Sequence, residues 1–258
     1  MTVALHYRVD GAADRPILVL GSSLGTTGEI WQPQLPALTE RFRVVRYDHR
    51  GHGGSPAPAG PYRIDQLGGD VLALLDRLEI ARAHLAGLSL GGQVAMWLAA
   101  HAPQRVDRLA LVCTAARFGT AQLWAERAAT VRSEGTAAVA DAVIGRWFTP
   151  DFAAGHAGVV AWARRLLTST PAEAYAACCD ALRDADLTAA LPAITAPTLV
   201  IAGAADPAAP PEAAHRIAAG VPGARVAVVP DAAHLATVEQ PDTVTRLLVD
   251  FLEGGHGR

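Results

Sequence analysis

The sequence predicts an α/β fold in which helices cover both faces of an open, mainly parallel sheet. Short runs of aliphatic and β-branched residues recur along the chain, and most of them do not alternate with polar residues. Strands that are apolar on both sides are typical of a parallel sheet between two layers of helices. Segments with helical spacing separate these runs, so strand and helix alternate as βαβ units.

The strands are expected, in chain order, at residues 17–20, 44–47, 84–86, 109–112, 198–202 and 226–229. Apolar residues have helical spacing over residues 67–78, before the third of these strands, and over residues 94–98, after it. Pro241 suits the first turn of a terminal helix. We expect the tail from Gly254 to Arg258 to be frayed.

The alternation breaks between about residues 118 and 191, where Ala, Arg, Trp and Leu recur at helical spacing without a strand-like run. Such a segment is too long for a loop. Open α/β sheets bind ligands at the carboxyl ends of their strands, so we interpret this helical insertion as a lid over that edge. Helices that only cover a face of the sheet are the alternative. A length of 258 residues fits one domain over residues 1–258, with the lid inside it.

The composition excludes several classes of function. All 22 basic residues are Arg, which excludes a lysine Schiff base, a lysine general base and a P-loop lysine. Against 25 acidic residues they leave a net charge of −3, which does not favour binding to nucleic acid. The three cysteines form no disulfide framework or metal motif, and no phosphate-binding loop is present. We therefore expect neither a metal nor another cofactor.

The location expected from the sequence is the cytoplasm. The N-terminus lacks the charged and apolar regions of a signal peptide. No uninterrupted apolar run approaches the ~20 residues that a membrane-spanning helix needs. A partner membrane is therefore not expected, and the sequence predicts no particular oligomeric state.

A serine nucleophile is predicted at Ser89, in the segment Gly87-Leu88-Ser89-Leu90-Gly91. This segment has the pattern G-x-S-x-G between an expected strand and an expected helix, where a tight turn strains the serine backbone. The hydroxyl would then lie at a helix N-terminus, where backbone N–H groups favour an oxyanion. An N-cap serine in a glycine-rich turn and a nucleotide loop are the alternatives.

A serine hydroxyl needs a histidine as its base and a carboxylate that orients this histidine. His234 follows the last expected strand, which is where the order Ser, acid, His places the base. His49 and His52 are its rivals, and their spacing could suggest a metal site. No second cluster of ligands accompanies them, so we interpret them as turn-forming residues.

The carboxylate is predicted at Asp206, in the loop that follows the strand at residues 198–202. A surface N-cap is the alternative role for this residue. Asp48 and Asp231 could take the catalytic role only if their loops folded unexpectedly. The order of Ser89, Asp206 and His234 along the chain therefore favours Asp206.

An oxyanion hole needs two backbone N–H donors. One is expected from Leu90, the residue after the nucleophile, and the other from the glycine-rich turn after the first expected strand. In that turn we choose Leu24 ahead of Ser23. The choice rests on position, because a backbone donor does not depend on the side chain.

With these residues in place, the chain resembles the α/β-hydrolase superfamily over essentially its full length, and within it the 3-oxoadipate enol-lactonases most. The motifs that mark the superfamily are Ser23-Leu24-Gly25-Thr26-Thr27 with Trp31, Asp48-His49-Arg50-Gly51-His52-Gly53-Gly54-Ser55, and Gly87-Leu88-Ser89-Leu90-Gly91-Gly92. The more specific matches are Arg146-Trp147-Phe148-Thr149-Pro150, Thr170-Pro171 with Tyr175-Ala176-Ala177-Cys178-Cys179, residues 181–187 and 196–203, and His234-Leu235 with Val238-Glu239-Gln240-Pro241. The chain departs from the family's pattern at Ala185 and Ala236.

The resemblance implies a serine hydrolase that uses no cofactor and acts on a small carboxylate lactone or ester. Its reaction would open a five-membered enol-lactone with an acetate arm to 3-oxoadipate, in the β-ketoadipate pathway of aromatic catabolism. A broad carboxylesterase, a perhydrolase and a C–C bond hydrolase are rival interpretations, because one fold and one set of catalytic residues serve all of them. An inactive hydrolase fold that acts as a ligand receptor is the non-enzymatic alternative.

A substrate carboxylate needs a cation or a set of neutral donors, and in a chain without Lys this cation must be Arg. Arg146, together with Trp147, is our candidate for binding the substrate from the insertion. The alternatives are Arg132, Arg164, Arg165 and Arg183.

Overall fold

The protein is described by a computed structural model over residues 2–254. Within this part of the chain, seven strands form one sheet in the order β1-β3-β2-β4-β5-β6-β7. β1 is antiparallel to β3, and all other neighbouring strands are parallel. The strands are β1 (Tyr7–Asp10), β2 (Ile17–Gly21), β3 (Arg43–Tyr47), β4 (Ala83–Leu88), β5 (Val106–Val112), β6 (Thr198–Gly203) and β7 (Arg225–Val229).

The expected mainly parallel sheet is confirmed, and strands β2 to β7 correspond to the expected ones. β5 begins three residues earlier than expected, at Val106 rather than residue 109. β1 was not expected, because Tyr7–Asp10 mixes polar and apolar residues and its side chains are half-buried or exposed. Such a strand can form at the edge of the sheet, where β3 is its only neighbour.

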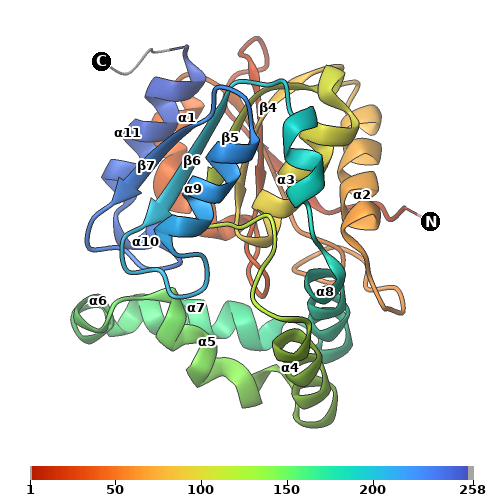
Figure 1. Ribbon diagram of the computed structural model, residues 1–258, viewed down its shortest axis with the longest axis vertical. Coiled ribbons are helices and arrows are strands. Elements are labelled where there is room, and N and C mark those ends of the chain that lie inside the picture. The colour runs from red at the N-terminus through yellow and green to blue at the C-terminus, as the bar shows by residue number, and fades with distance from the viewer. Residues whose placement is uncertain (1, 255–258) are drawn as a thin grey trace.

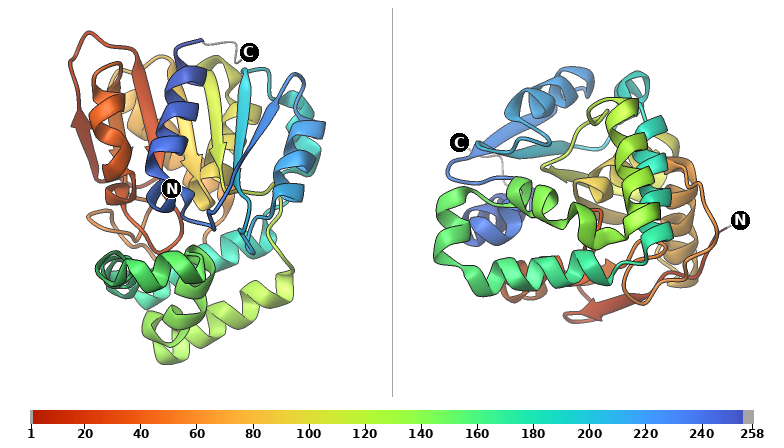
Figure 2. Two further views of the ribbon diagram at one scale, coloured as in Figure 1. Left: turned by 90° about the vertical axis from the view of Figure 1, so that its left-hand side faces the viewer. Right: turned by 90° about the horizontal axis from the view of Figure 1, so that it is seen from below.

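Two layers of helices cover the sheet (Figures 1 and 2). On one face lie α1 (Leu35–Thr39) and α11 (Pro241–Leu252), and on the other lie α2 (Ile64–Arg77), α3 (Leu90–His101) and α9 (Pro211–Gly220). α10 (Ala236–Glu239) precedes α11, and short 3₁₀ helices occupy Gly28–Gln34, Pro103–Arg105, Thr136–Val139 and Thr188–Ala193. No helix within residues 2–254 combines the length and the apolar character needed to cross a membrane. Residues 255–258, in the tail that we expected to be frayed, lie outside the described residues.

Between β5 and β6 the described chain forms helices and no strand. These helices are α4 (Ala121–Glu134), α5 (Ala140–Trp147), α6 (Pro150–Gly155), α7 (Ala157–Ser169) and α8 (Ala172–Asp184). Figures 1 and 2 show them together, in green to cyan, beyond the carboxyl ends of the parallel strands. This part of the chain is called the insertion below.

The strand order reverses between β2 and β4. From β2 the chain passes to β3 on one side, and β4 then returns to the other side of β2. Gly21 at the end of β2 pairs with Gly87 in β4, so the loops that follow these two strands begin side by side. Reversal of the strand order opens a crevice between such loops, which is where open α/β sheets bind ligands.

The helix after β4 begins in close contact with the backbone of β2. A Cβ atom at Gly91 would overlap the backbone of Gly21 and lie 2.8 Å from the amide nitrogen of Ser22. The Gly91 N–H donates to the carbonyl oxygen of Ser22 at 3.0 Å. A residue without a side chain is therefore required at Gly91, and it fixes the start of α3 against the loop after β2.

Two buried histidines hold the same loop from its other side. His49 Nε2 donates to the carbonyl oxygen of Ser22 at 2.9 Å, and His52 Nε2 accepts from the Gly25 N–H at 2.9 Å. His52 Nδ1 lies 3.2 Å from the Arg50 carbonyl oxygen, to which it donates. Both imidazoles are therefore engaged with backbone groups, and the loop after β2 is fixed by them.

Replacing Gly91 by Ala is expected to lower the free energy of unfolding by about 3 kcal/mol, because backbone and helix must separate to admit a methyl group. Gly145 provides a matched control, since a Cβ atom there meets nothing within 4 Å. Gly145→Ala should change stability by no more than about 1 kcal/mol, in the stabilising direction. Urea denaturation of both variants measures the difference. Equal stability of the two variants would contradict the close contact at Gly91.

His49 makes the stability depend on pH. Burial and the nearby His52 lower its pKa from an ordinary 6.5 to about 3, against smaller opposing effects of the Ser22 carbonyl and Asp48. Between these two values the unfolded chain binds a proton that the folded chain does not, so stability falls as the pH falls. In His49→Gln, the unfolding free energy measured from pH 6 to pH 4.5 should fall less steeply, by up to about 1.4 kcal/mol per pH unit. Identical slopes would show that His49 does not titrate in this way.

Candidate active site

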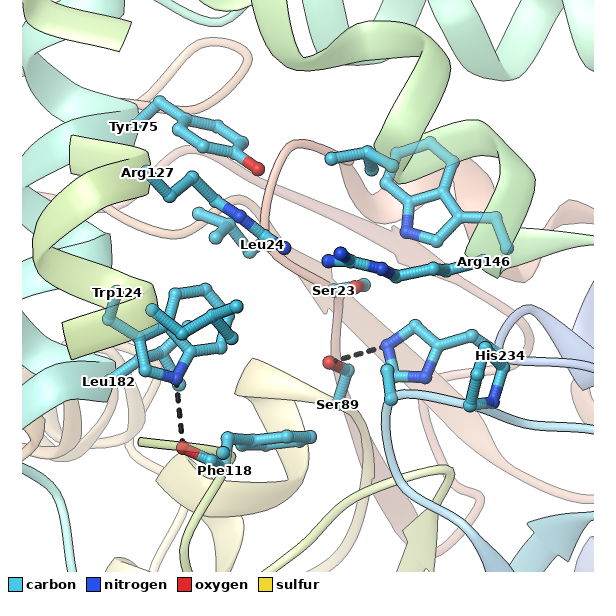
Figure 3. A pocket seen from close by; sticks show the side chains of 16 residues that line it. Ser23, Leu24, Ser89, Phe118, Trp124, Arg127, Arg146, Tyr175, Leu182 and His234 are labelled. Carbon is cyan, nitrogen blue, oxygen red and sulfur yellow. Dashed lines mark hydrogen bonds between the residues drawn. The ribbon is translucent and has the colours of Figure 1, made fainter. Parts of the chain in front are cut away.

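Three side chains from distant parts of the sequence form a hydrogen-bonded chain at the carboxyl edge of the sheet. Ser89 Oγ lies 2.8 Å from His234 Nε2, and His234 Nδ1 lies 2.8 Å from Asp206 Oδ2. Figure 3 shows the first of these hydrogen bonds at the base of a pocket. The residues follow β4, β6 and β7, which is where the sequence placed them. All three are buried, with between 3% and 7% of their surface exposed.

The local backbone positions Ser89 and Asp206. Ser89 has a positive φ of 55°, in the turn between β4 and α3. Asp206 Oδ1 accepts from the N–H groups of Ala208 and Ala209, at 2.8 and 3.0 Å, which leaves Oδ2 directed at the imidazole. Burial alone would raise the pKa of Asp206, but the charge of His234 and these hydrogen bonds outweigh it and lower the pKa. The carboxylate form is thus favoured beside His234.

Two backbone amides near this chain have no partner. Leu24 and Leu90 are buried, and within residues 2–254 neither of their N–H groups donates a hydrogen bond. Leu24 follows β2 and Leu90 opens α3, so both belong to the pair of loops that begin side by side. Unpaired buried amides are rare because they lose their hydrogen bonds to water. Both N–H groups therefore remain available to a ligand at this edge.

A cavity of about 250 Å³ lies above Ser89. One part of its wall comes from loops at the carboxyl ends of the strands, including Ser23, Leu24 and His234. The other part comes from the insertion, and comprises Phe118, Gly119, Leu123, Trp124, Arg127, Val143, Arg146, Trp147, Tyr175 and Leu182. The reactive edge of the sheet and the insertion therefore enclose the same space, which Figure 3 shows in part.

Two arginines reach into this cavity from opposite walls. Arg146, our candidate from the sequence, extends from α5, and Arg127 extends from α4 (Figure 3). Neither forms an ion pair with a carboxylate within the described residues. Sequence reasoning missed Arg127. The signal available in the sequence was its spacing of three residues from Trp124, which places both on one face of a helix. In the structure, the guanidinium carbon of Arg127 lies 4.7 Å from the centre of that indole ring.

The other arginines that we considered lie outside the cavity wall. Arg132 pairs with Glu173 and Asp180, and Arg164 pairs with Asp141. The remaining two are Arg183, which pairs with Asp180 and Asp184, and Arg165, which is exposed on α7. Their charges are thus neutralised by neighbours or hydrated by solvent.

The charges in the cavity wall favour an anionic ligand. Burial and the charge of Arg127 lower the pKa of Arg146, and Tyr175 opposes this shift. Burial raises the pKa of Tyr175, which keeps the phenol neutral, while the charge of Arg127 offsets part of this shift. Two guanidinium groups that repel each other in a partly desolvated space gain most from an anionic ligand between them.

The remaining titratable side chains from the sequence analysis form no cluster of metal ligands within residues 2–254. No three His, Cys, Asp or Glu side chains within residues 2–254 gather as a potential metal site. Cys113, Cys178 and Cys179 are free and buried. Asp48, an alternative acid in the sequence, instead accepts hydrogen bonds from His6 and from the backbone of Gly28 and Gly54.

Comparison with known proteins agrees with this architecture. Residues 16–241 match the family model described as alpha/beta hydrolase fold. The chain is 43% identical to 3-oxoadipate enol-lactonase 2 of Acinetobacter baylyi, over 93% of this chain and 89% of that protein. The crystal structure of the enol-lactonase from Burkholderia xenovorans LB400 matches with a TM-score of 0.96 and 47% identity, over 97% of each chain.

A second group of relatives has a different name. The chain is 38% identical to a proposed carbamate hydrolase, RutD, of Variovorax paradoxus, over 96% of each protein. The two groups of relatives are thus named as a lactonase and as a carbamate hydrolase, and both are similar to this chain over nearly its full length. The family model, the sheet topology and these similarities agree, and the chain belongs to the α/β-hydrolase family.

Proposed function

We propose that this protein is a serine hydrolase that opens 3-oxoadipate enol-lactone to 3-oxoadipate. The observation that carries the proposal is the hydrogen-bonded chain of Ser89, His234 and Asp206, at the base of a cavity with two arginines that have no carboxylate partner among residues 2–254. The similarity to enol-lactonases from two bacteria supports the same substrate. We further propose that the insertion, at about residues 118–191, serves as a lid that completes this cavity.

The first half of the reaction forms an acyl-enzyme. His234 Nε2 takes the proton of Ser89 Oγ, and the alkoxide attacks the carbonyl carbon of the lactone. The backbone N–H groups of Leu24 and Leu90 bind the negative oxygen of the tetrahedral intermediate. When the intermediate collapses, the ring C–O bond breaks. The enol oxygen leaves with the proton from His234, and the enol then converts to the ketone.

The second half releases the product. His234 takes a proton from a water molecule, whose oxygen attacks the acyl carbon, and the proton returns to Ser89 as the ester bond breaks. Throughout both halves, Asp206 keeps Nδ1 of His234 protonated and stabilises the imidazolium. One water molecule is consumed for each lactone, and the acyl group leaves as a carboxylate.

The acetate arm of the substrate explains the two arginines. Its carboxylate would lie between Arg127 and Arg146, where two guanidinium groups can each donate paired hydrogen bonds. Trp147 lines the same wall and supplies an apolar surface for the ring. A neutral ester would make no ion pair with these arginines. Removing either arginine should therefore weaken binding of an anionic lactone more than binding of a simple ester.

The similarity to a proposed carbamate hydrolase favours one second candidate. A carbamate offers the same acyl carbon to Ser89 but lacks the carboxylate arm. The arginine pair therefore favours the lactone. A broad carboxylesterase, a perhydrolase and a C–C bond hydrolase are further alternatives, and turnover of the enol-lactone by the wild type well above that of a simple aryl ester would favour the lactonase over them.

Ser89→Ala should lower kcat for the enol-lactone by several orders of magnitude and leave the fold intact, because no other group can attack the carbonyl. Loss of the ultraviolet absorbance of synthetic enol-lactone measures turnover, and circular dichroism checks folding. Labelling of the wild type, but not of the variant, by a fluorophosphonate probe identifies the nucleophile. Turnover of the variant near the wild-type rate would refute the assignment. Failure of the probe to label the wild type would favour an inactive receptor.

Arg127→Ala and Arg146→Ala should each lower kcat/KM for the enol-lactone about ten- to hundredfold, mainly through a higher KM, because one charge-assisted contact is lost. Hydrolysis of a neutral aryl acetate should change less than about threefold. Arg165→Ala is the matched control, since that arginine is exposed on α7 and outside the cavity wall. Equal losses on both substrates would contradict the role of the arginines in binding a carboxylate.

A further inference from the structure

A buried carboxylate joins the His234 loop to the insertion. Glu239, at the end of α10, is only 6% exposed. Its Oε2 accepts from the N–H of Ala233, the residue before His234, at 2.8 Å. Its Oε1 accepts from the N–H of Thr149 at 2.9 Å and from the hydroxyl of the same threonine. One side chain therefore uses both oxygens to hold two segments that lie more than eighty residues apart in the sequence.

The two segments also bind each other directly. The His234 N–H donates to the carbonyl oxygen of Arg146 at 3.4 Å, and the Leu235 N–H donates to that of Trp147 at 2.9 Å. The chain at residues 146–149 thus runs beside the chain at residues 233–235, and Glu239 closes one end of this pairing. The loop of the proposed base is therefore built on the insertion as well as on the sheet.

The same short segment of the insertion carries the side chain of Arg146 into the cavity. Its backbone supports His234, while its side chain faces the place proposed for the carboxylate of the substrate. Movement of this segment would consequently change the position of the imidazole and of the guanidinium together. A group that fixes this segment against the His234 loop therefore fixes the positions of both the His234 imidazole and the Arg146 guanidinium.

We propose that Glu239 is a positioning residue for the reaction, which holds the His234 imidazole in line with Ser89 by anchoring its loop to the segment that carries Arg146. The inference rests on the proposed function, because it assigns to Glu239 a role that acts through His234. Glu239 does not line the cavity, so it has no direct contact with the substrate. Small displacements of a catalytic group can lower the rate about a hundredfold, which gives this anchoring its importance.

Glu239→Gln tests the proposal with little change in volume. Glutamine has one acceptor oxygen and one NH₂ group, and the side chain faces N–H donors on both sides, from Ala233 and Thr149. Either orientation of the amide therefore places two donors against each other and breaks one of the two links. Thr149→Val is a milder second variant, because it removes the hydroxyl and keeps the carboxylate with both backbone contacts.

We expect Glu239→Gln to lower kcat about ten- to hundredfold for both the enol-lactone and a neutral aryl acetate. KM for the lactone should change much less than kcat, because Arg127 and Arg146 remain. The rate at which a fluorophosphonate labels Ser89 should fall by a similar factor. In proton NMR, the downfield resonance of the His234 Nδ1–H should shift or broaden. Thr149→Val should show the same effects at smaller size, and the two substitutions should be non-additive, since they break one bridge.

Asp180→Asn is the matched control. Asp180 is a buried carboxylate of the insertion that pairs with Arg132 and Arg183, and it touches neither the His234 loop nor the cavity. This variant should lower the midpoint of thermal unfolding but leave kcat per folded molecule and the His234 resonance unchanged. The comparison separates lost stability from lost positioning, provided that rates are measured well below the unfolding midpoint of each variant.

Two results would overturn the inference. Glu239→Gln could be destabilised like Asp180→Asn while its kcat on both substrates stays within twofold of the wild type. Alternatively, its loss could lie in KM for the lactone alone, which would make Glu239 a residue that supports substrate binding. If Glu239→Gln does not fold, an unchanged kcat and labelling rate in Thr149→Val would overturn the inference equally. In each case a large effect of Ser89→Ala would leave the proposed function standing, whereas its absence would remove both.

Discussion

The positive φ of 55° at Ser89 is the constraint on which the site depends. An L-residue adopts this conformation at a cost of about 1–3 kcal/mol, so the surrounding backbone must impose it. Here the end of β4 and the start of α3 are held between the loop after β2 and strand β5. Gly91 donates to the Ser22 carbonyl, and the Ser89 N–H donates to the carbonyl of Val112. The hydroxyl is thereby turned out of the sheet toward the cavity.

The cavity is positively charged because two of its arginines have no carboxylate beside them in the described chain. Most arginines of the insertion form ion pairs with Asp or Glu, as Arg132 does with Glu173 and Asp180. Arg127 and Arg146 face the enclosed space without such a partner in the described chain. Asp206 lies outside the cavity wall, where its carboxylate form is favoured beside the imidazole of His234. The positive charge of the two arginines therefore faces the cavity, and the negative charge of Asp206 lies on the far side of His234 from Ser89.

The sheet and the insertion both hold the loop that carries His234. The backbone of Arg146 and Trp147 binds the loop of His234, and Glu239 joins both. In the proposed reaction, a substrate held by Arg146 would therefore be connected through this backbone to the imidazole of His234. This connection also limits how far residues 146–149 can move without disturbing the hydrogen bond between His234 and Ser89.

The sequence by itself determined the parallel sheet, its alternation with helices, and the order in which Ser89, Asp206 and His234 follow their strands. Local chemistry carries this information, because apolar runs and a G-x-S-x-G turn keep the same meaning in any α/β chain. Only the tertiary structure decided that Arg127 joins Arg146 in one cavity and that Glu239 bridges two distant segments. Helical spacing shows which face of a helix a side chain shares, but not which distant helix or loop that face meets. Partners separated by many residues become evident only when packing brings them together.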